Sequence, residues 1–274
     1  MENFYVFLIL LNFVSLKAND DVPESFDSRK KWPNCIPKIY DQGTCGACYA
    51  ISTATVFSTR YCIKNNLTQI INFSPQNLVN CLSGCNGEFP DVTWNYISKS
   101  GITTDICLPY KKRENSCSNK CESKDNKLKL FHSGETIFLE DEISIKKEIM
   151  ENGPVTSMMY LYQDYYNYKS GIYIHSDGEN YFGFHAIAIV GWGVEKNVKY
   201  WIVQDSYGTS RGENGYMKIK IGDSSGAGAT AFCGKIDEIY EEINEENNNY
   251  NITISIGKSN FLNNYLIFMF LFLI

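Results

Sequence analysis

The stretch "YDQGTCGACYAISTATVFSTRYC", Tyr40 to Cys62, contains both the expected start of a helix and a pair of closely spaced cysteines. Cys45 and Cys48 stand three residues apart, a spacing found in zinc sites, in thiol–disulfide oxidoreductases and around cysteine nucleophiles. The residues that follow predict a helix that begins at Cys48, because apolar side chains recur at spacings of three and four on one face: Ala50, Ala54, Phe57 and Tyr61. Which of these roles the two cysteines have must therefore be inferred from the rest of the chain.

The composition describes a folded protein that is not basic. The chain has 274 residues, 44% of them hydrophobic, enough to bury the core of one large domain or of two lobes sharing a cleft. The formal net charge is -6, and the 25 lysines and arginines are scattered rather than gathered in tracts. Because nucleic-acid binders carry basic patches, nucleic acid is excluded as a partner.

Residues 1–18 predict a secretory signal peptide. An apolar run extends from Phe4 to Leu16, and Ala18 is a small residue of the kind that signal peptidase prefers. A buried N-terminal helix is the alternative, because only the α-amino group supplies positive charge ahead of the run. The signal implies the secretory pathway, ending in a lysosome-like or vacuolar compartment, in secretion or at the cell surface. Three glycosylation sequons fit this route, at Asn66, Asn72 and Asn251.

Ten cysteines in a chain with such a signal indicate disulfides rather than free thiols. Nine of them lie between Cys35 and Cys121, and Cys233 stands alone near the end. The first half is therefore expected to be held by disulfides and the second by ordinary packing. This asymmetry predicts two differently built lobes.

The periodicity of the apolar residues also changes between the halves. Helices are expected at Ser74 to Cys81, with Ser74 as cap and Pro75 at the first helical position, and at Pro90 to Lys99. After Asn152 the pattern becomes that of short strands between glycine turns. The clearest are "HAIAIVGWG" from His185, "KYWIVQDS" from Lys199 and "GYMKIKIG" from Gly215. The predicted fold class is α+β.

The end of the chain differs in composition from the rest. Residues 241–260 are acidic and rich in Asn, and are expected to form an exposed linker. Residues 261–274 form a hydrophobic tail that is too short to span a bilayer as a helix. The tail is interpreted as a GPI-attachment signal, as an uncleaved membrane-associated tail, or as a buried terminus.

A metal site is not expected at Cys45 and Cys48. A structural zinc site needs a second pair of ligands, and none of the three histidines, His132, His175 and His185, is paired with another ligand at finger spacing. A redox role requires a strand-to-helix turn in a βαβ unit, and no such alternation surrounds the motif.

A cysteine nucleophile fits the same stretch better. A thiol on the first turn of a helix is stabilised as thiolate by the helix dipole and by a nearby imidazolium, which favours Cys48. Gln42 lies six residues earlier and offers an amide N–H to an oxyanion, beside the backbone N–H of Cys48. His185 is the candidate base, and Asp205, at the end of a strand, is the candidate for orienting its ring.

Five motifs together resemble the papain-like cysteine proteases. They are "DQGTCGACYA", "GCNGEFP", "FHAIAIVGWG", "YWIVQDSYGT" and "GENGYMKI", in that family's order and spacing. The resemblance assigns Cys48, His185 and Asp205 as nucleophile, base and orienting residue, and Gln42 as oxyanion donor. It covers Val22 to about Tyr240, so residues 19–240 are predicted to form the peptidase domain.

Within that family the sequence resembles the cathepsin B type, through "VPESFDSRKKWPNC", "RYCI", "NGPV", "YKSGIY" and "GWGVE". The resemblance implies a two-lobed fold, with a helical disulfide-rich lobe, an antiparallel β-barrel lobe and the cleft between them. It implies no cofactor, protein or peptide substrates, and cystatin-type inhibitors. It also implies four disulfides: Cys35 with Cys62, Cys45 with Cys85, Cys81 with Cys117, and Cys107 with Cys121.

Two segments of the cathepsin B type are missing from the sequence. The histidine-bearing occluding loop is absent, because Cys107-Leu108-Pro109-Tyr110 is followed by only six residues before Cys117, none of them His. An open cleft and endopeptidase action are therefore expected. The mature-type start "VPESFD" directly follows the signal, which leaves no room for a propeptide.

Several site positions also depart from the family pattern. Asp205 replaces the usual Asn, and as a carboxylate it is expected to raise the pKa of His185. The other altered neighbours are Ala47 for Ser, Tyr49 for Trp and Tyr207 for Trp. Three residues are assigned to substrate binding: Gly87, Glu88 in place of the second Gly of a pair, and Glu238 for a basic side chain. The alternative to an active endopeptidase is a catalytically impaired papain-fold protein that binds without cleaving.

Overall fold

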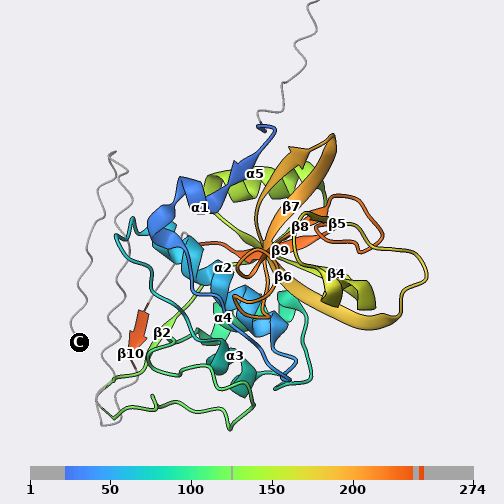
Figure 1. The fold of residues 1–274 in the computed structure, drawn as a ribbon. Helices are drawn as coiled ribbons and strands as arrows, with labels where there is room; N and C mark the ends of the chain where they lie inside the picture. The colour runs from blue at the N-terminus through green and yellow to red at the C-terminus, as the bar shows by residue number, and fades with distance from the viewer. Residues whose placement is uncertain (1–21, 125, 237–240, 244–274) are drawn as a thin grey trace, which may run out of the picture.

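The computed structural model describes residues 22–124 and 126–236, together with the backbone of 241–243 (Figure 1). The predicted signal peptide, most of the predicted linker, the hydrophobic tail and Glu238 lie outside the described residues. Within the described part of the chain, no helix combines the length and the apolar character that crossing a membrane requires.

Most helices lie in the first half of the chain and begin at capping signals. Ser74 accepts a hydrogen bond from the Asn77 backbone N–H, and proline occupies the first position of α3 and of α4, as expected. The helices are α1 (Ser28–Lys31), η1 (Pro33–Cys35), α2 (Cys48–Lys64), α3 (Pro75–Cys81), α4 (Pro90–Ser100), α5 (Glu142–Asn152) and η2 (Gln163–Asn167). Helix α5, capped by Asp141, was not expected from the sequence.

The strands lie mainly in the second half. They are β1 (Phe26–Asp27), β2 (Lys129–Phe131), β3 (Thr136–Leu139), β4 (Val155–Tyr162), β5 (Ile172–Tyr173), β6 (Tyr181–Glu195), β7 (Val198–Gln204), β8 (Tyr216–Lys220), β9 (Ala231–Gly234) and β10 (Glu241–Ile243). One eight-stranded sheet runs in the order β3-β9-β4-β6-β7-β8-β5, with β1 beside β6, and β10 pairs with β2 separately. Strand β6 begins at Tyr181, earlier than the predicted start at His185.

The arrangement is the predicted α+β fold with two lobes. Figure 1 shows helices α2, α3 and α4 together on one side and strands β4 to β8 on the other. The sheet departs in one detail from the all-antiparallel expectation, because β5 and β8 pair in parallel, Ile172 with Lys218 and Tyr173 with Ile219. The 3-10 turn η2 precedes β5 and redirects the chain into this short edge strand.

Helix α2 lies at the centre of the molecule rather than on its surface. The sequence predicted a single apolar face, but 13 of the 17 residues are buried, because α2 packs against β6, α3 and α4. The burial includes Arg60, whose guanidinium pairs with Glu148 at 2.8 Å and donates to the carbonyls of Pro154 and Gly153. These partners compensate the buried charge.

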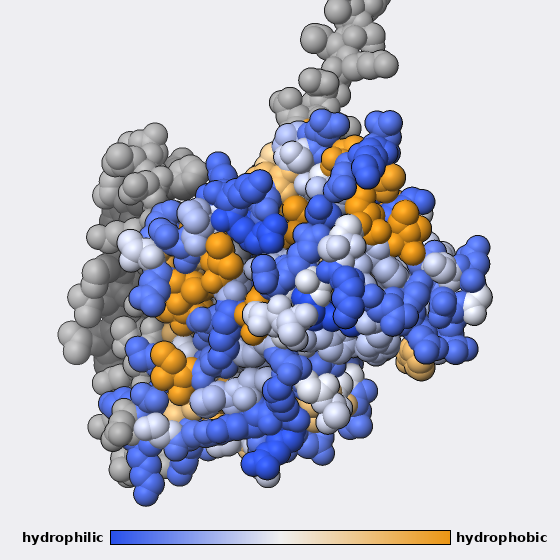
Figure 2. All heavy atoms as spheres, viewed as in Figure 1, coloured by the Kyte–Doolittle hydropathy of each residue, from blue (hydrophilic) through white to orange (hydrophobic). Residues whose placement is uncertain are grey.

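Four disulfides join the same pairs of cysteines that the resemblance implies: Cys35–Cys62, Cys45–Cys85, Cys81–Cys117 and Cys107–Cys121. All of them lie in the helical half, which leaves Cys48 and Cys233 as free thiols. The second half is held by packing around Trp192 and Trp201, which are almost fully buried. On the face drawn in Figure 2 the surface is mostly hydrophilic, and apolar residues form separate patches.

Candidate active site

Cys48 is the first residue of helix α2 and is partly exposed. Cys45 is tied to Cys85, and the Gly46 backbone N–H donates to the Cys85 carbonyl at 3.0 Å. A Cβ at Gly46 would stand 2.5 Å from that carbonyl oxygen, so this close approach requires glycine. The two cysteines thus have separate structural positions: Cys45 anchors the loop, and Cys48 carries a free thiol at the helix N-terminus.

His185 and Asp205 come from neighbouring strands. His185 lies within β6, and Asp205 follows β7, which pairs antiparallel with β6. The His185 Nε2–H donates to Asp205 Oδ1 at 2.8 Å, and the Ser206 backbone N–H donates to the same oxygen at 2.8 Å. Both side chains are nearly inaccessible, at 1% and 2% exposure. Water therefore competes little for this hydrogen bond.

The Cys48 thiol and the His185 ring interact across the two lobes. Burial alone raises the pKa of the Cys48 thiol, but the hydrogen bond and charge of His185 and the backbone N–H of Ala186 lower it below its ordinary value. Burial lowers the pKa of His185, and hydrogen bonds to Asp205 and Cys48 overcome it and raise the pKa to about 10. The arrangement therefore favours a thiolate–imidazolium pair.

Ser206 holds Gln42 through hydrogen bonds to both its backbone and its side chain. Its backbone N–H donates to the Ser206 carbonyl at 2.7 Å, and its side-chain Oε1 accepts from Ser206 Oγ at 2.5 Å. Its amide nitrogen donates to the Cys45 carbonyl at 3.0 Å. Because a primary amide carries two hydrogens, a second N–H is available to another acceptor near the start of α2.

The altered neighbours of the site are held by ring contacts, a hydrogen bond and burial. The Tyr207 ring stacks on the His185 ring, with centroids 5.1 Å apart and an interplanar angle of 12°. Tyr49 is fully buried and its hydroxyl donates to the Gly84 carbonyl at 2.9 Å. Ala47 is also fully buried and precedes α2. None of these three side chains breaks the hydrogen bond between His185 and Asp205.

The loop with Gly87 and Glu88 lies close to the start of α2, because Gly46 and Asn86 form a parallel bridge. Gly87 has a φ of +84° and no atom within 4 Å of the position of a Cβ. The Glu88 carboxylate turns back into its own loop, where it accepts from Ser83 Oγ at 2.5 Å and from the Phe89 backbone N–H at 2.9 Å. This side chain is therefore held in the loop.

Three residues near the catalytic candidates were not singled out from the sequence. Ser206 anchors Gln42, Tyr165 packs edge-on against His185 with centroids 5.8 Å apart, and Arg211 lies 5.6 Å from the Tyr207 ring. Ser206 directly follows Asp205 in "YWIVQDSYGT", which was a usable signal. No sequence signal separated Tyr165 from the other tyrosines around it.

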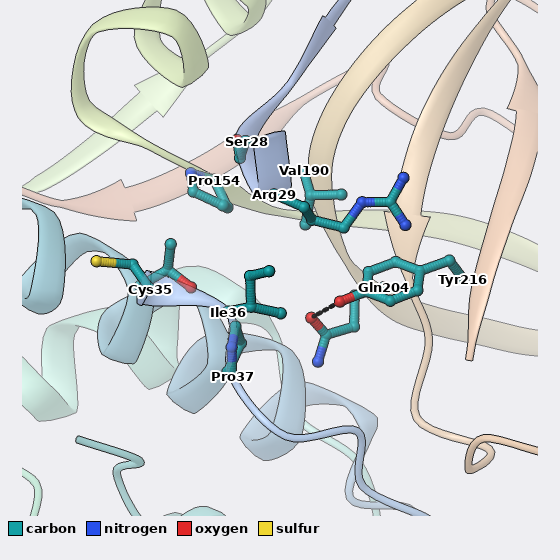
Figure 3. A pocket seen from close by; sticks show the side chains of 10 residues that line it. Ser28, Arg29, Cys35, Ile36, Pro37, Pro154, Val190, Gln204 and Tyr216 are labelled. Atoms are coloured by element: carbon teal, nitrogen blue, oxygen red, sulfur yellow. Dashed lines mark hydrogen bonds between the residues drawn. The ribbon is translucent and has the colours of Figure 1, made fainter. Parts of the chain in front are cut away.

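Figure 3 shows a small pocket between residues 28–37 and the ends of β7 and β8, where Gln204 and Tyr216 lie. The Tyr216 hydroxyl lies 3.4 Å from Gln204 Oε1 there, and neither Cys48 nor His185 lines the pocket. It has room for about one water molecule, so it is not a substrate site. Among the described residues, no group of three His, Cys, Asp or Glu side chains is arranged to hold a metal ion.

Comparisons with known proteins find a matching family model and several relatives. The family model described as "Papain family cysteine protease" matches residues 22–236. A cathepsin B-like protein, CP2 of Giardia intestinalis, is 35% identical over 229 residues, covering 80% of this chain and 76% of the relative. A gut-specific cysteine proteinase of Caenorhabditis elegans is 36% identical over 243 residues, covering 78% of this chain and 74% of the relative. The solved structure of procathepsin B S9 from Trypanosoma congolense superposes with a TM-score of 0.74 at 34% identity. The match covers 82% of this chain and 81% of that chain.

Proposed function

The chain belongs to the papain family of cysteine proteases and is of the cathepsin B-like type, and on this premise we propose that it is an active endopeptidase. The observation that carries the proposal is the hydrogen bond between His185 and Asp205, together with the interaction of His185 with the Cys48 thiol, which lowers the pKa of the thiol. A thiolate held in this way is a strong nucleophile at neutral pH.

In the proposed reaction the Cys48 thiolate attacks the carbonyl carbon of the substrate peptide bond. The oxyanion that forms accepts hydrogen bonds from the Cys48 backbone N–H and from the second amide hydrogen of Gln42. Because His185 Nε2 is engaged with Asp205, Nδ1 is the ring nitrogen that serves the thiol. It gives its proton to the leaving amine, and an acyl-enzyme remains.

Water then completes the proposed cycle. Neutral His185 takes a proton from water, the hydroxide attacks the acyl carbonyl, and the Cys48 thiolate is released while the imidazolium is restored. The Asp205 carboxylate accepts from Nε2 throughout, which fixes the ring orientation and stabilises the imidazolium. The same oxyanion donors serve both halves of the reaction.

We infer endopeptidase action from the short segment between Cys107 and Cys121. It contains no histidine, and its two ends are tied together by the disulfide between these cysteines. Gly87 is proposed to pair with the substrate backbone as an added strand, because nothing crowds it. Release of C-terminal dipeptides from an N-terminally blocked peptide faster than internal cleavage would contradict this inference.

An epoxysuccinyl affinity probe tests whether the protein is an enzyme. We expect stoichiometric labelling of the native protein and none of the Cys48→Ala variant, since the probe alkylates an activated thiolate. A folded wild-type protein that stays unlabelled would instead support a papain-fold binding protein. Disulfide-exchange activity that is lost on substitution of Cys45 would support a redox function.

The cellular setting of the proposed enzyme follows from the predicted signal peptide and the hydrophobic tail. We propose entry into the secretory pathway and residence in a lysosome-like compartment, outside the cell or on its surface, with the tail as the membrane attachment. Protein substrates fit the family. Cystatin-type inhibitors are proposed as further partners, because they bind in the clefts of papain-like enzymes.

A further inference from the structure

One oxygen of the Asp205 carboxylate has no conventional hydrogen-bond partner. Oδ1 accepts from His185 Nε2 and from the Ser206 backbone N–H, each at 2.8 Å. Oδ2 is buried and meets no donor in good hydrogen-bond geometry. A carboxylate that is cut off from water is destabilised unless donors approach both of its oxygens. The site therefore requires a donor on the Oδ2 side.

The Tyr165 hydroxyl is the candidate for that donor. Tyr165 belongs to η2 and is fully buried, and its oxygen is also without a conventional partner. Tyr165 packs edge-on against His185, whose Nε2–H donates to Asp205, and its hydroxyl interacts electrostatically with the Asp205 side chain. Burial first, and the charge of Asp205 second, raise the pKa of Tyr165 well above its ordinary value. The phenol therefore keeps its proton, so it faces the carboxylate as a donor.

Three neighbours hold the Tyr165 ring in this position. The ring packs edge-on against His185 on one side and against Tyr173, at 5.3 Å between centroids, on another. The Arg211 guanidinium lies 5.5 Å from the ring and donates to the carbonyls of Tyr165 and Tyr166. The backbone of η2 and the side chain of Tyr165 are thus fixed together.

We propose that Tyr165 is a positioning residue that donates a hydrogen bond to Asp205 Oδ2 and so holds the carboxylate in place while it orients His185. The inference rests on the proposed function of the Cys48–His185 pair. The donor matches a carboxylate in particular, because both carboxylate oxygens only accept. An amide at position 205 would present an NH₂ group to the same hydroxyl, which would then have to accept.

The proposal predicts a direction for the pH dependence. The ionisable groups around Asp205 are Tyr165 on η2, His185 on β6, Cys48 on α2, and Tyr207 and Arg211 on the segment after β7. A donor to Oδ2 stabilises the ionised carboxylate more than the neutral acid. Loss of the donor therefore favours uptake of a proton by the hydrogen-bonded Asp205–His185 pair, so this uptake occurs at higher pH. The acid limb of the profile of kcat/KM against pH must therefore move to higher pH.

The test uses Tyr165→Phe, which removes only the hydroxyl. We expect the acid limb of kcat/KM to rise by about one pH unit, so that kcat/KM below the limb falls about tenfold. In an Asp205→Asn background the same substitution should leave the limb unmoved, because an amide does not titrate. An unchanged limb in the single variant, or an equal shift in both backgrounds, overturns the proposal.

Tyr173→Phe is the matched control. It removes a neighbouring phenol hydroxyl that donates to a different carboxylate, Asp164 Oδ1, at 2.7 Å. It should leave the acid limb where it is. A shift as large as that of Tyr165→Phe would mean that losing any tyrosine hydroxyl in this lobe moves the limb by disturbing the packing. The proposal would then fail.

A second measurement does not depend on turnover. The chain has only three histidines, so the ring resonances of His185 can be followed by NMR in ¹⁵N-histidine-labelled Cys48→Ala protein. The acid-side inflection of these resonances should move upward by about one pH unit when Tyr165→Phe is added. An inflection that does not move overturns the proposal even if the protein proves to be catalytically inactive.

Discussion

The charge of Asp205, rather than its hydrogen bond alone, should set the alkaline limit of activity. Asp205→Asn keeps an oxygen that accepts from His185 Nε2 but removes the negative charge. In the native protein the pKa of His185 is raised from 6.5 to about 10, with Asp205 and Cys48 as the two sources of the increase. An opposite charge at hydrogen-bond distance contributes about 1–3 pKa units. In the variant the His185 imidazolium should therefore lose its proton at about pH 8.

The sign of the effect follows from linkage. The pKa of His185 is higher in the folded protein than its ordinary value of 6.5. The pair therefore contributes stability that is complete below pH 6.5 and is lost as the pH rises through about 10. Activity that depends on the imidazolium follows the same window, so the native enzyme should stay active to higher pH than the variant.

The assay is kcat/KM for an internally quenched peptide, measured across the basic limb with circular dichroism as a check on folding. Asp164→Asn is the control, because Asp164 pairs with a different histidine, His175, at 3.2 Å in the same lobe. It should leave the basic limb unchanged. A basic limb of Asp205→Asn that coincides with that of the native enzyme would show that the carboxylate does not hold the imidazolium.

Three further substitutions have expected outcomes. Gln42→Ala should lower kcat by about 10²–10³ with the fold intact, as for loss of one oxyanion donor, and a less than tenfold fall in single-turnover acylation would argue against that role. Gly46→Ala should cost about 1–3 kcal/mol of unfolding free energy, because its Cβ would meet the Cys85 carbonyl at 2.5 Å; denaturation in the Cys48→Ala background measures it. Glu148→Gln should cost about 3 kcal/mol, since it leaves the buried Arg60 charge unpaired, and a neutral result would disprove the pairing.

The elements with strong local signals could be predicted from the sequence. Helix α3 begins at Pro75 after the Ser74 cap, as expected, because a capping residue and a proline act on the neighbouring backbone. Helix α2 begins at Cys48, as expected from the spacing of its apolar residues. The short strand β9 (Ala231–Gly234) could not be predicted in this way. It is defined by its pairing with β3 and β4, which are distant in sequence.

It was harder to predict which residues are buried than which segments form helices or strands. Arg60 lies on a helix where a charge is normally solvated, and it is buried only because α2 lies between the two lobes and Glu148 supplies the opposite charge. Helix α5 begins at a capping residue, Asp141, but its apolar positions alternate with charged ones, which weakened the helical pattern.

The site residues divide in the same way. Cys48 and His185 carry recognisable chemistry and lie in strong motifs, so the sequence alone singled them out. Tyr165 is one of several tyrosines in "YLYQDYYNYKSGIY", and only the turn of η2 directs its ring inward while Tyr166 remains exposed. Residues that act through a neighbour become visible only when the packing is known.

The central claim is that Cys48 is a thiolate paired with His185, and the pH dependence of its alkylation by iodoacetamide tests this most directly. We predict that the rate reaches its plateau with a midpoint well below the ordinary thiol value of about 8.5, and that His185→Ala moves the midpoint up toward that value. A midpoint near about 8.5 in the native protein, unchanged by His185→Ala, would contradict the claim.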